Sequence, residues 1–87
     1  MKGLKKDIEY NFDLDVFLDP WNRLWIQHND INIGIEKIAE YISITANSIS
    51  DYKISDHIFC NDEESILYCL MKYCKDVHKW GDFNNLN

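Results

Sequence analysis

The stretch IEYNFDLDVFL, residues 8–18, decides which fold class the sequence predicts. Its even positions are all apolar or aromatic, and its odd positions are polar or acidic except for Phe17. A period of two is typical of a strand with one buried face. As a helix, the stretch would bring Ile8, Phe12 and Val16 together but scatter its other apolar side chains, and its Asp and Asn content disfavours helix. We therefore expect a strand, with a helix as the alternative.

A chain reversal is expected directly after this strand, at the sequence DPWN of residues 19–22. Pro20 presets the φ angle that the first central position of a type I turn requires, and Asp19 is favoured before it. Residues 23–28 would then return as a second strand and complete a hairpin, although Leu24, Trp25 and Ile26 are adjacent apolar residues without alternation.

Two amphipathic helices are predicted in the rest of the chain. The first covers residues 31–47, where apolar side chains recur every three to four residues after an N-cap at Asn29 or Asp30. The β-branched run at its end leaves that boundary open. Residues 47–59 form a connection in which residues 52–58 are a candidate extended piece.

The second helix is expected over residues 62–80 and carries every local signal of a helix. Asn61 is a suitable N-cap, acidic residues follow it, and lysines lie toward the other end, where they complement the helix dipole. Gly81 then stands where a left-handed terminator is favoured, and residues 82–87 form a polar tail.

These elements predict one compact α+β domain over residues 1–87, with an N-terminal strand or hairpin packed against two amphipathic helices. An all-α bundle, with the first stretch helical, is the alternative. No run of residues is apolar enough for a membrane span or a signal peptide, so we expect a cytoplasmic protein. The odd cysteine count, at Cys60, Cys69 and Cys74, favours reduced thiols over a disulfide framework.

No cofactor, metal or catalytic motif is present in the sequence. The cysteines contain no close pair of the kind that structural zinc sites use, and the three glycines do not fall within a phosphate-loop spacing. Nothing in the sequence brings a histidine beside a serine or a carboxylate. We therefore expect a protein that is not an enzyme.

Acidic residues dominate the charge, with a net charge of −6 and an isoelectric point near 4.8, which disfavours binding to nucleic acid. On the predicted strand they form a row at odd positions: Asp7, Glu9, Asp13, Asp15 and Asp19. Carboxylates two residues apart on a strand are roughly 6.6 Å apart, about two axial base steps of one nucleic-acid strand. The alternative interpretation is a strand with one solvated face.

Aromatic residues are numerous, and Trp21 in the predicted turn is the one expected to be exposed. Tryptophan and tyrosine are frequent anchors of protein interfaces. The predicted contacts to a partner protein are Glu9, Asp13, Asp15, Asp19 and Trp21. Together they describe an acidic face with an aromatic anchor, which suits a basic partner protein.

In size, acidity and lack of cofactor or catalytic motifs, the sequence resembles the small immunity proteins that protect bacteria from nuclease toxins of the colicin and contact-dependent growth inhibition types. The resemblance implies a cytoplasmic inhibitor that binds one cognate toxin, one to one, and blocks its active site or the path of its substrate. It matches no family motif, so no residue role follows from it. A phage-type nucleic-acid mimic that blocks a host defence nuclease and an acidic structural or adaptor module are the alternatives.

Overall fold

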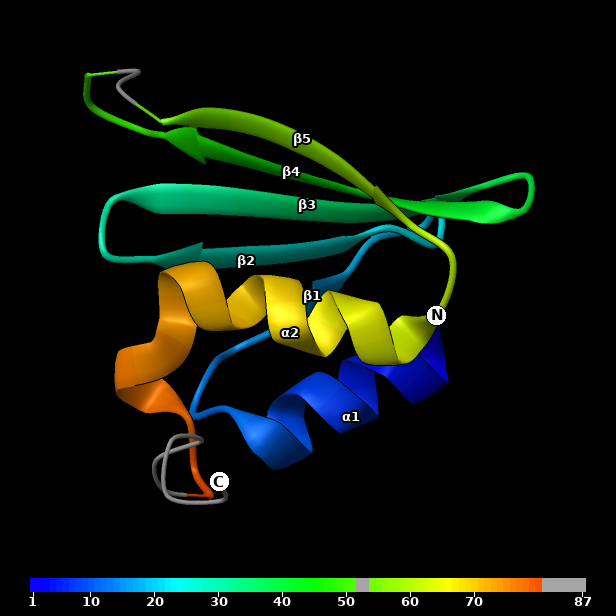
Figure 1. Cartoon of the computed structure of the whole chain (residues 1–87), viewed down its shortest axis with the longest axis horizontal. Coiled ribbons are helices and arrows are strands. Elements are labelled where there is room, and N and C mark those ends of the chain that lie inside the picture. Colours follow the sequence, from blue (N-terminus) through cyan, green and yellow to red (C-terminus); the bar gives the residue numbers. More distant parts are fainter. Residues whose placement is uncertain (52–53, 81–87) are drawn as a thin grey trace.

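The computed structural model describes residues 1–51 and 54–80. It contains a five-stranded antiparallel sheet, with one helix before the strands and one after them in chain order. In chain order the elements are α1 (Lys2–Asn11), β1 (Phe17–Leu18), β2 (Leu24–His28), β3 (Ile31–Ile38), β4 (Tyr41–Ser48), β5 (Ser55–Cys60), α2 (Glu63–Cys74) and the short 3-10 helix η1 (Lys75–Val77). The strands keep their chain order in the sheet, and both helices lie on the same side of it (Figure 1). The predicted strand or hairpin packed against two helices is therefore wrong, and so is the all-α bundle, because the two helices accompany a sheet of five strands rather than one strand or hairpin.

The stretch at residues 8–18 is divided between two conformations rather than forming one strand. Leu4, Ile8 and Phe12 are at most 1% exposed, and their spacing of four places them on one face of α1 and its cap. Leu4, which lies before the stretch, is part of this buried face. The expected alternation survives only over residues 13–18, where Asp13, Asp15 and Phe17 are exposed.

The helix predicted over residues 31–47 is instead the hairpin of β3 and β4. Its isoleucines alternate as well as recurring every three to four residues, and β-branched side chains favour the extended conformation. The strands meet at Ile38 opposite Tyr41, and Ala39, with a φ of 54°, begins the two-residue turn between them. Asn29 and Asp30, expected as helix caps, form the preceding turn with φ values of 47° and 66°.

The turn at residues 19–22 and the returning strand are confirmed. The amide of Asn22 donates to the carbonyl of Asp19 at 3.1 Å, and the amide of Asp19 donates to the carbonyl of Arg23 at 2.9 Å. Asn22 has a φ of 63°, as expected for a three-residue hairpin loop that ends in a left-handed residue. β2 therefore returns beside β1, with Trp25 opposite Phe17.

The second predicted helix exists but is shorter, because α2 ends at Cys74 and η1 continues to Val77. Its N-cap is Asp62 rather than Asn61, and the Asp62 carboxylate accepts a hydrogen bond from the Ser65 amide at 2.8 Å. The extended piece expected over residues 52–58 corresponds to β5, which runs from Ser55 to Cys60. Residues 52–53, Gly81 and the predicted tail lie outside the described residues.

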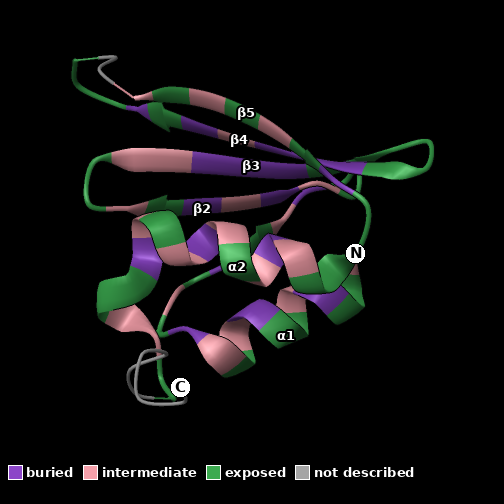
Figure 2. Cartoon of the chain, viewed as in Figure 1, coloured by how far each residue is buried: buried purple, intermediate pink, exposed green. Residues whose placement is uncertain are grey.

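One hydrophobic core lies between the sheet and the two helices. Figure 2 shows buried residues gathered on β3 and β4 and on parts of both helices. The aliphatic side chains of Ile33, Ile35 and Ile44 meet those of Ile8 and Leu70 in this core. Among residues 1–51 and 54–80, no helix has the length and apolar character needed to cross a membrane.

Candidate binding face

The candidate site is the face of the sheet opposite the helices, which we call the open face. Alternate residues of each strand point away from the core onto this face. The strand register aligns them in two neighbouring rows: Phe17, Trp25, Gly34, Thr45 and His57 in the first, and Glu36, Ser43 and Phe59 in the second. Phe17 and Phe59 are 62% and 58% exposed, and Tyr41, farther along β4 on the same face, is 50% exposed. The open face therefore presents large aromatic side chains to solvent.

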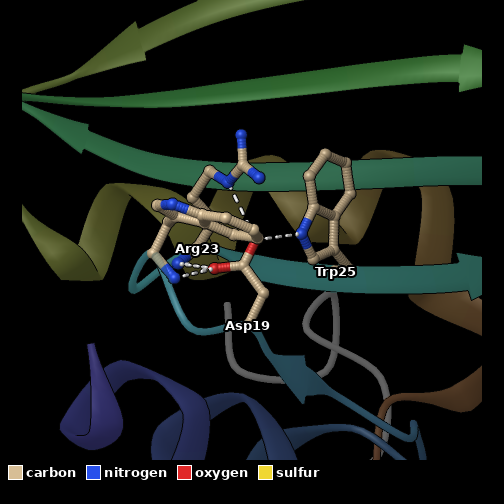
Figure 3. Close-up of polar contacts among 4 residues, drawn as sticks. Asp19, Arg23 and Trp25 are labelled. Atoms are coloured by element: carbon tan, nitrogen blue, oxygen red, sulfur yellow. Dashed lines mark hydrogen bonds and ion pairs between the residues drawn. The ribbon is translucent and has the colours of Figure 1, made fainter.

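Asp19 supports one end of the open face by accepting four hydrogen bonds (Figure 3). Its Oδ1 accepts from the amides of Trp21 and Arg23, both at 2.9 Å. Its Oδ2 accepts from Arg23 Nε at 2.8 Å and from Trp25 Nε1 at 2.9 Å. Burial opposes ionisation of this carboxyl, but the hydrogen bonds outweigh burial and lower the pKa of Asp19 to about 2. With its side chain 6% exposed, Asp19 holds the turn together rather than facing a partner.

Arg23 lies between two indole rings at this end of the face. Its guanidinium carbon is 5.4 Å from the ring centroids of both Trp21 and Trp25. The Trp25 ring lies over Gly34, since a Cβ atom on Gly34 would come within 2.7 Å of that ring. Trp25 is thereby fixed in place, whereas Trp21 remains 74% exposed and available for contact.

A serine and a histidine also meet on the open face, which the sequence did not indicate. Ser43 Oγ is 2.7 Å from His57 Nε2, and the His57 ring packs 4.5 Å from that of Phe59. Only the register of β4 and β5 brings these residues together, so no spacing in the chain predicts the pair. Ser43 is 5% exposed, and among the described residues no carboxylate orients His57. Within the described residues, this pair is therefore not part of a triad of nucleophile, base and orienting group.

The predicted acidic row does not exist, because its residues lie on different elements. Glu9 is on α1, where it pairs with Lys5 at 3.1 Å. Asp13 lies beside η1, and its amide donates to the carbonyl of Val77 at 2.8 Å. Asp15 borders the open face, in a shallow hollow that it shares with Phe17, Trp25, Gln27 and Asn32. Of the five predicted contacts, the structure therefore brings only Asp15 and Trp21 to the open face or its border.

The charge of the open face is acidic. Glu36 and Asp15 are exposed there, and neither forms a salt bridge within the part of the chain that the structure describes. Arg23, which lines a small hollow together with Glu36, is already paired with Asp19. Glu36 was absent from the predicted contacts because the sequence suggested a helix at its position.

Within residues 1–51 and 54–80, no group of three or more His, Cys, Asp or Glu side chains is arranged to hold a metal ion. Comparison of the chain with protein-family models, with curated proteins and with solved structures finds no match.

Proposed function

We propose that this protein is a non-enzymatic inhibitor of the same class as the small immunity proteins of nuclease toxins. It would bind a basic protein through its open face. The observation that carries the proposal is the coincidence, on one sheet face, of exposed aromatic side chains with carboxylates that form no salt bridge to any residue that the structure describes. The partner would be a cognate nuclease toxin, bound one to one in the cytoplasm.

The aromatic side chains would supply the affinity of such a complex. Trp21 and Phe59 are 74% and 58% exposed, so each would lose a large apolar area from water on binding. Because the strands and the Asp19 hydrogen bonds hold the backbone, little conformational entropy would be lost on binding. A surface of this kind favours one defined partner over weak general association.

The acidic groups would supply the rate of association and the selectivity. Asp15 and Glu36 lie among the aromatics, and the whole chain carries a net charge of −6. A nuclease presents lysines and arginines where it holds nucleic acid, so opposite fields would steer the two proteins together. Binding there would cover the path of the substrate.

A nucleic-acid mimic is less well supported than an immunity-type inhibitor. Mimicry calls for carboxylates at the regular spacing of phosphates. Glu9 instead lies on a helix, where it pairs with Lys5, and Asp13 and Asp15 lie at two places in a loop. The acidic surface therefore fits local contacts with basic side chains better than it fits the outline of a nucleic-acid strand.

The test is capture of a partner from the source lysate, followed by measurement of affinity and inhibition with the purified partner. Two double variants change the net charge equally: Asp15→Lys with Glu36→Lys on the open face, and Asp7→Lys with Asp13→Lys elsewhere. We expect a basic nuclease whose activity is lost at one equivalent of the inhibitor. The open-face variant should bind at least roughly ten-fold more weakly, and the control should keep most of its affinity.

Equal weakening by both variants would show that total charge, not the open face, governs binding. A captured partner that keeps its activity when saturated would identify an adaptor instead of an inhibitor. Capture of a multi-protein defence complex would favour the mimic. Each of these results would overturn the proposal.

A further inference from the structure

Two cysteines from different elements are in contact at the junction of β5 and α2. The Sγ atoms of Cys60 and Cys69 are 3.6 Å apart, and both thiols are free. Cys60 ends β5 and is 6% exposed, whereas Cys69 on α2 is partly exposed. Cys69 is therefore the more accessible residue of the pair, and its sulfur contacts the sulfur of the buried Cys60.

The same junction is fixed at its other end by polar contacts. The carboxylate of Asp56 on β5 accepts hydrogen bonds from Lys72 Nζ at 3.1 Å and from the hydroxyl of Tyr73, both at the end of α2. These contacts hold the helix beside the strand on the far side of Cys69. The two sulfurs consequently stay near each other in the folded chain rather than meeting by chance.

We propose that Cys60 and Cys69 form a reversible intramolecular disulfide, which makes the β5–α2 junction a site of thiol oxidation independent of the proposed binding face. A disulfide sulfur pair is about 2.05 Å apart, so the sulfurs must approach by roughly 1.5 Å. A shift of this size is available to side-chain rotation and a small displacement of the helix.

The oxidant in this reaction is a small-molecule disulfide such as oxidised glutathione. The Cys69 thiolate attacks one glutathione sulfur, forms a mixed disulfide and releases one glutathione thiolate. The Cys60 thiolate then attacks Cys69 Sγ and releases the second. Two protein thiols are oxidised, one glutathione disulfide is reduced to two thiols, and the two protein protons pass to the released thiolates.

Burial raises the pKa of the Cys60 thiol to about 11, and the neighbouring Cys69 adds to this rise. Ring closure should therefore accelerate as the pH rises, because the Cys60 thiolate fraction grows.

Cys74 offers a matched control on the same helix. It is 0% exposed, and burial raises the pKa of its thiol to about 11. Among the described residues, the sulfur–sulfur contact joins Cys60 to Cys69 and does not include Cys74. An oxidant that reacted with cysteines without regard to the fold would modify all three residues, whereas the proposed geometry spares Cys74.

The experiment incubates the folded full chain with oxidised glutathione, alkylates the remaining thiols and measures the intact mass. We expect one alkyl group instead of three and the loss of two hydrogen atoms. Trypsin, which cleaves after Lys53, Lys72 and Lys75, should release residues 54–72 with both linked cysteines and residues 73–75 with alkylated Cys74. A second cleavage after Glu63 or Glu64 should leave two peptides joined by the disulfide.

Three single-cysteine replacements test which thiols form the disulfide. Cys74→Ser should form the disulfide as the native chain does, and Cys60→Ser should stop at a glutathione adduct on Cys69. The oxidised native chain should melt roughly 10 °C higher than the reduced chain, whereas Cys69→Ser should show no such rise. Alkylation of all three thiols after oxidation, or lasting glutathione adducts on the native chain, would overturn the proposal.

Discussion

The two faces of the sheet differ in chemistry although they are made by the same strands. On the covered face, Ile33, Ile35 and Ile44 are at most 1% exposed and pack against the helices. On the open face, Tyr41 and Phe59 are at least half exposed. Aliphatic side chains fill a core without polar groups to satisfy, whereas aromatics give a large contact area to a partner. Adjacent residues of the same strands can therefore bury an aliphatic core on one face and leave aromatic side chains exposed to solvent on the other.

The largest effect should come from Ile44→Ala, compared with Thr45→Ala one residue further along β4. Ile44 is 1% exposed at the centre of the core, so its truncation should cost about 2–5 kcal/mol of unfolding free energy. Thr45 points to the open face, and its replacement should cost less than about 1 kcal/mol. Urea denaturation of both variants measures the difference. Equal losses would contradict the division of the two faces.

Asp19→Asn should have the next largest effect, because the new amide would place a donor against the donors that now surround the carboxylate. We expect a fall in Tm of roughly 10 °C at pH 7. Asp15→Asn, on an exposed side chain at the border of the open face, should leave the Tm within about 2 °C of the native value. Thermal unfolding followed by circular dichroism distinguishes them, and similar Tm values would argue against the hydrogen-bond network.

The same aspartate gives a pH dependence of defined sign. The pKa of Asp19 falls from 3.8 to about 2 on folding, so its contribution is present above pH 3.8 and is lost as the pH falls toward 2. The native chain should lose stability steeply in this window, and Asp19→Asn should lose less. Asp56, Asp62 and Asp76, whose pKa values are also lowered, preserve some acid sensitivity in the variant. Parallel Tm curves between pH 2 and pH 5 would contradict this assignment.

A smaller effect is expected from Gly34→Ala on the open face. The added methyl would lie 2.7 Å from a carbon of the Trp25 ring, which must move, so we expect a loss of about 1–2 kcal/mol and a changed tryptophan fluorescence. Gly3→Ala in α1 meets nothing within 4 Å and should stabilise by up to about 1 kcal/mol. A Gly34→Ala chain with native fluorescence would show that Trp25 does not rest on the glycine.

The smallest effect on stability should follow Trp21→Ala. Because Trp21 is 74% exposed, its removal should change the unfolding free energy by less than about 0.5 kcal/mol. If the open face binds the proposed partner, affinity should nevertheless fall at least roughly ten-fold. Tyr68→Ala, which removes a 59% exposed aromatic from α2, serves as the control and should preserve affinity. If a binding titration showed a larger loss of affinity for Tyr68→Ala than for Trp21→Ala, the interface would lie on the helices instead.

Sequence reasoning was sufficient to predict the features that depend on neighbouring residues. Proline at position 20 with aspartate before it located the first hairpin turn, and the charge gradient after Asp62 located α2. Trp21 was expected to be exposed because it lies in that turn, and it is. Such features follow from local dihedral and capping energies, which do not require knowledge of the rest of the chain.

The face of the sheet on which each residue lies depends on tertiary contacts. Residues 31–47 fit both a helical period and an alternating one, and pairing between β3 and β4 selected the second because it buries Ile33 and Ile44 on one side. Ile8 likewise lies in a helix, because Leu4 and Phe12 complete the apolar face of that helix in the core. The open face and the Cys60–Cys69 contact follow from strand register and helix packing, which couple residues distant in sequence and cannot be read from local propensities.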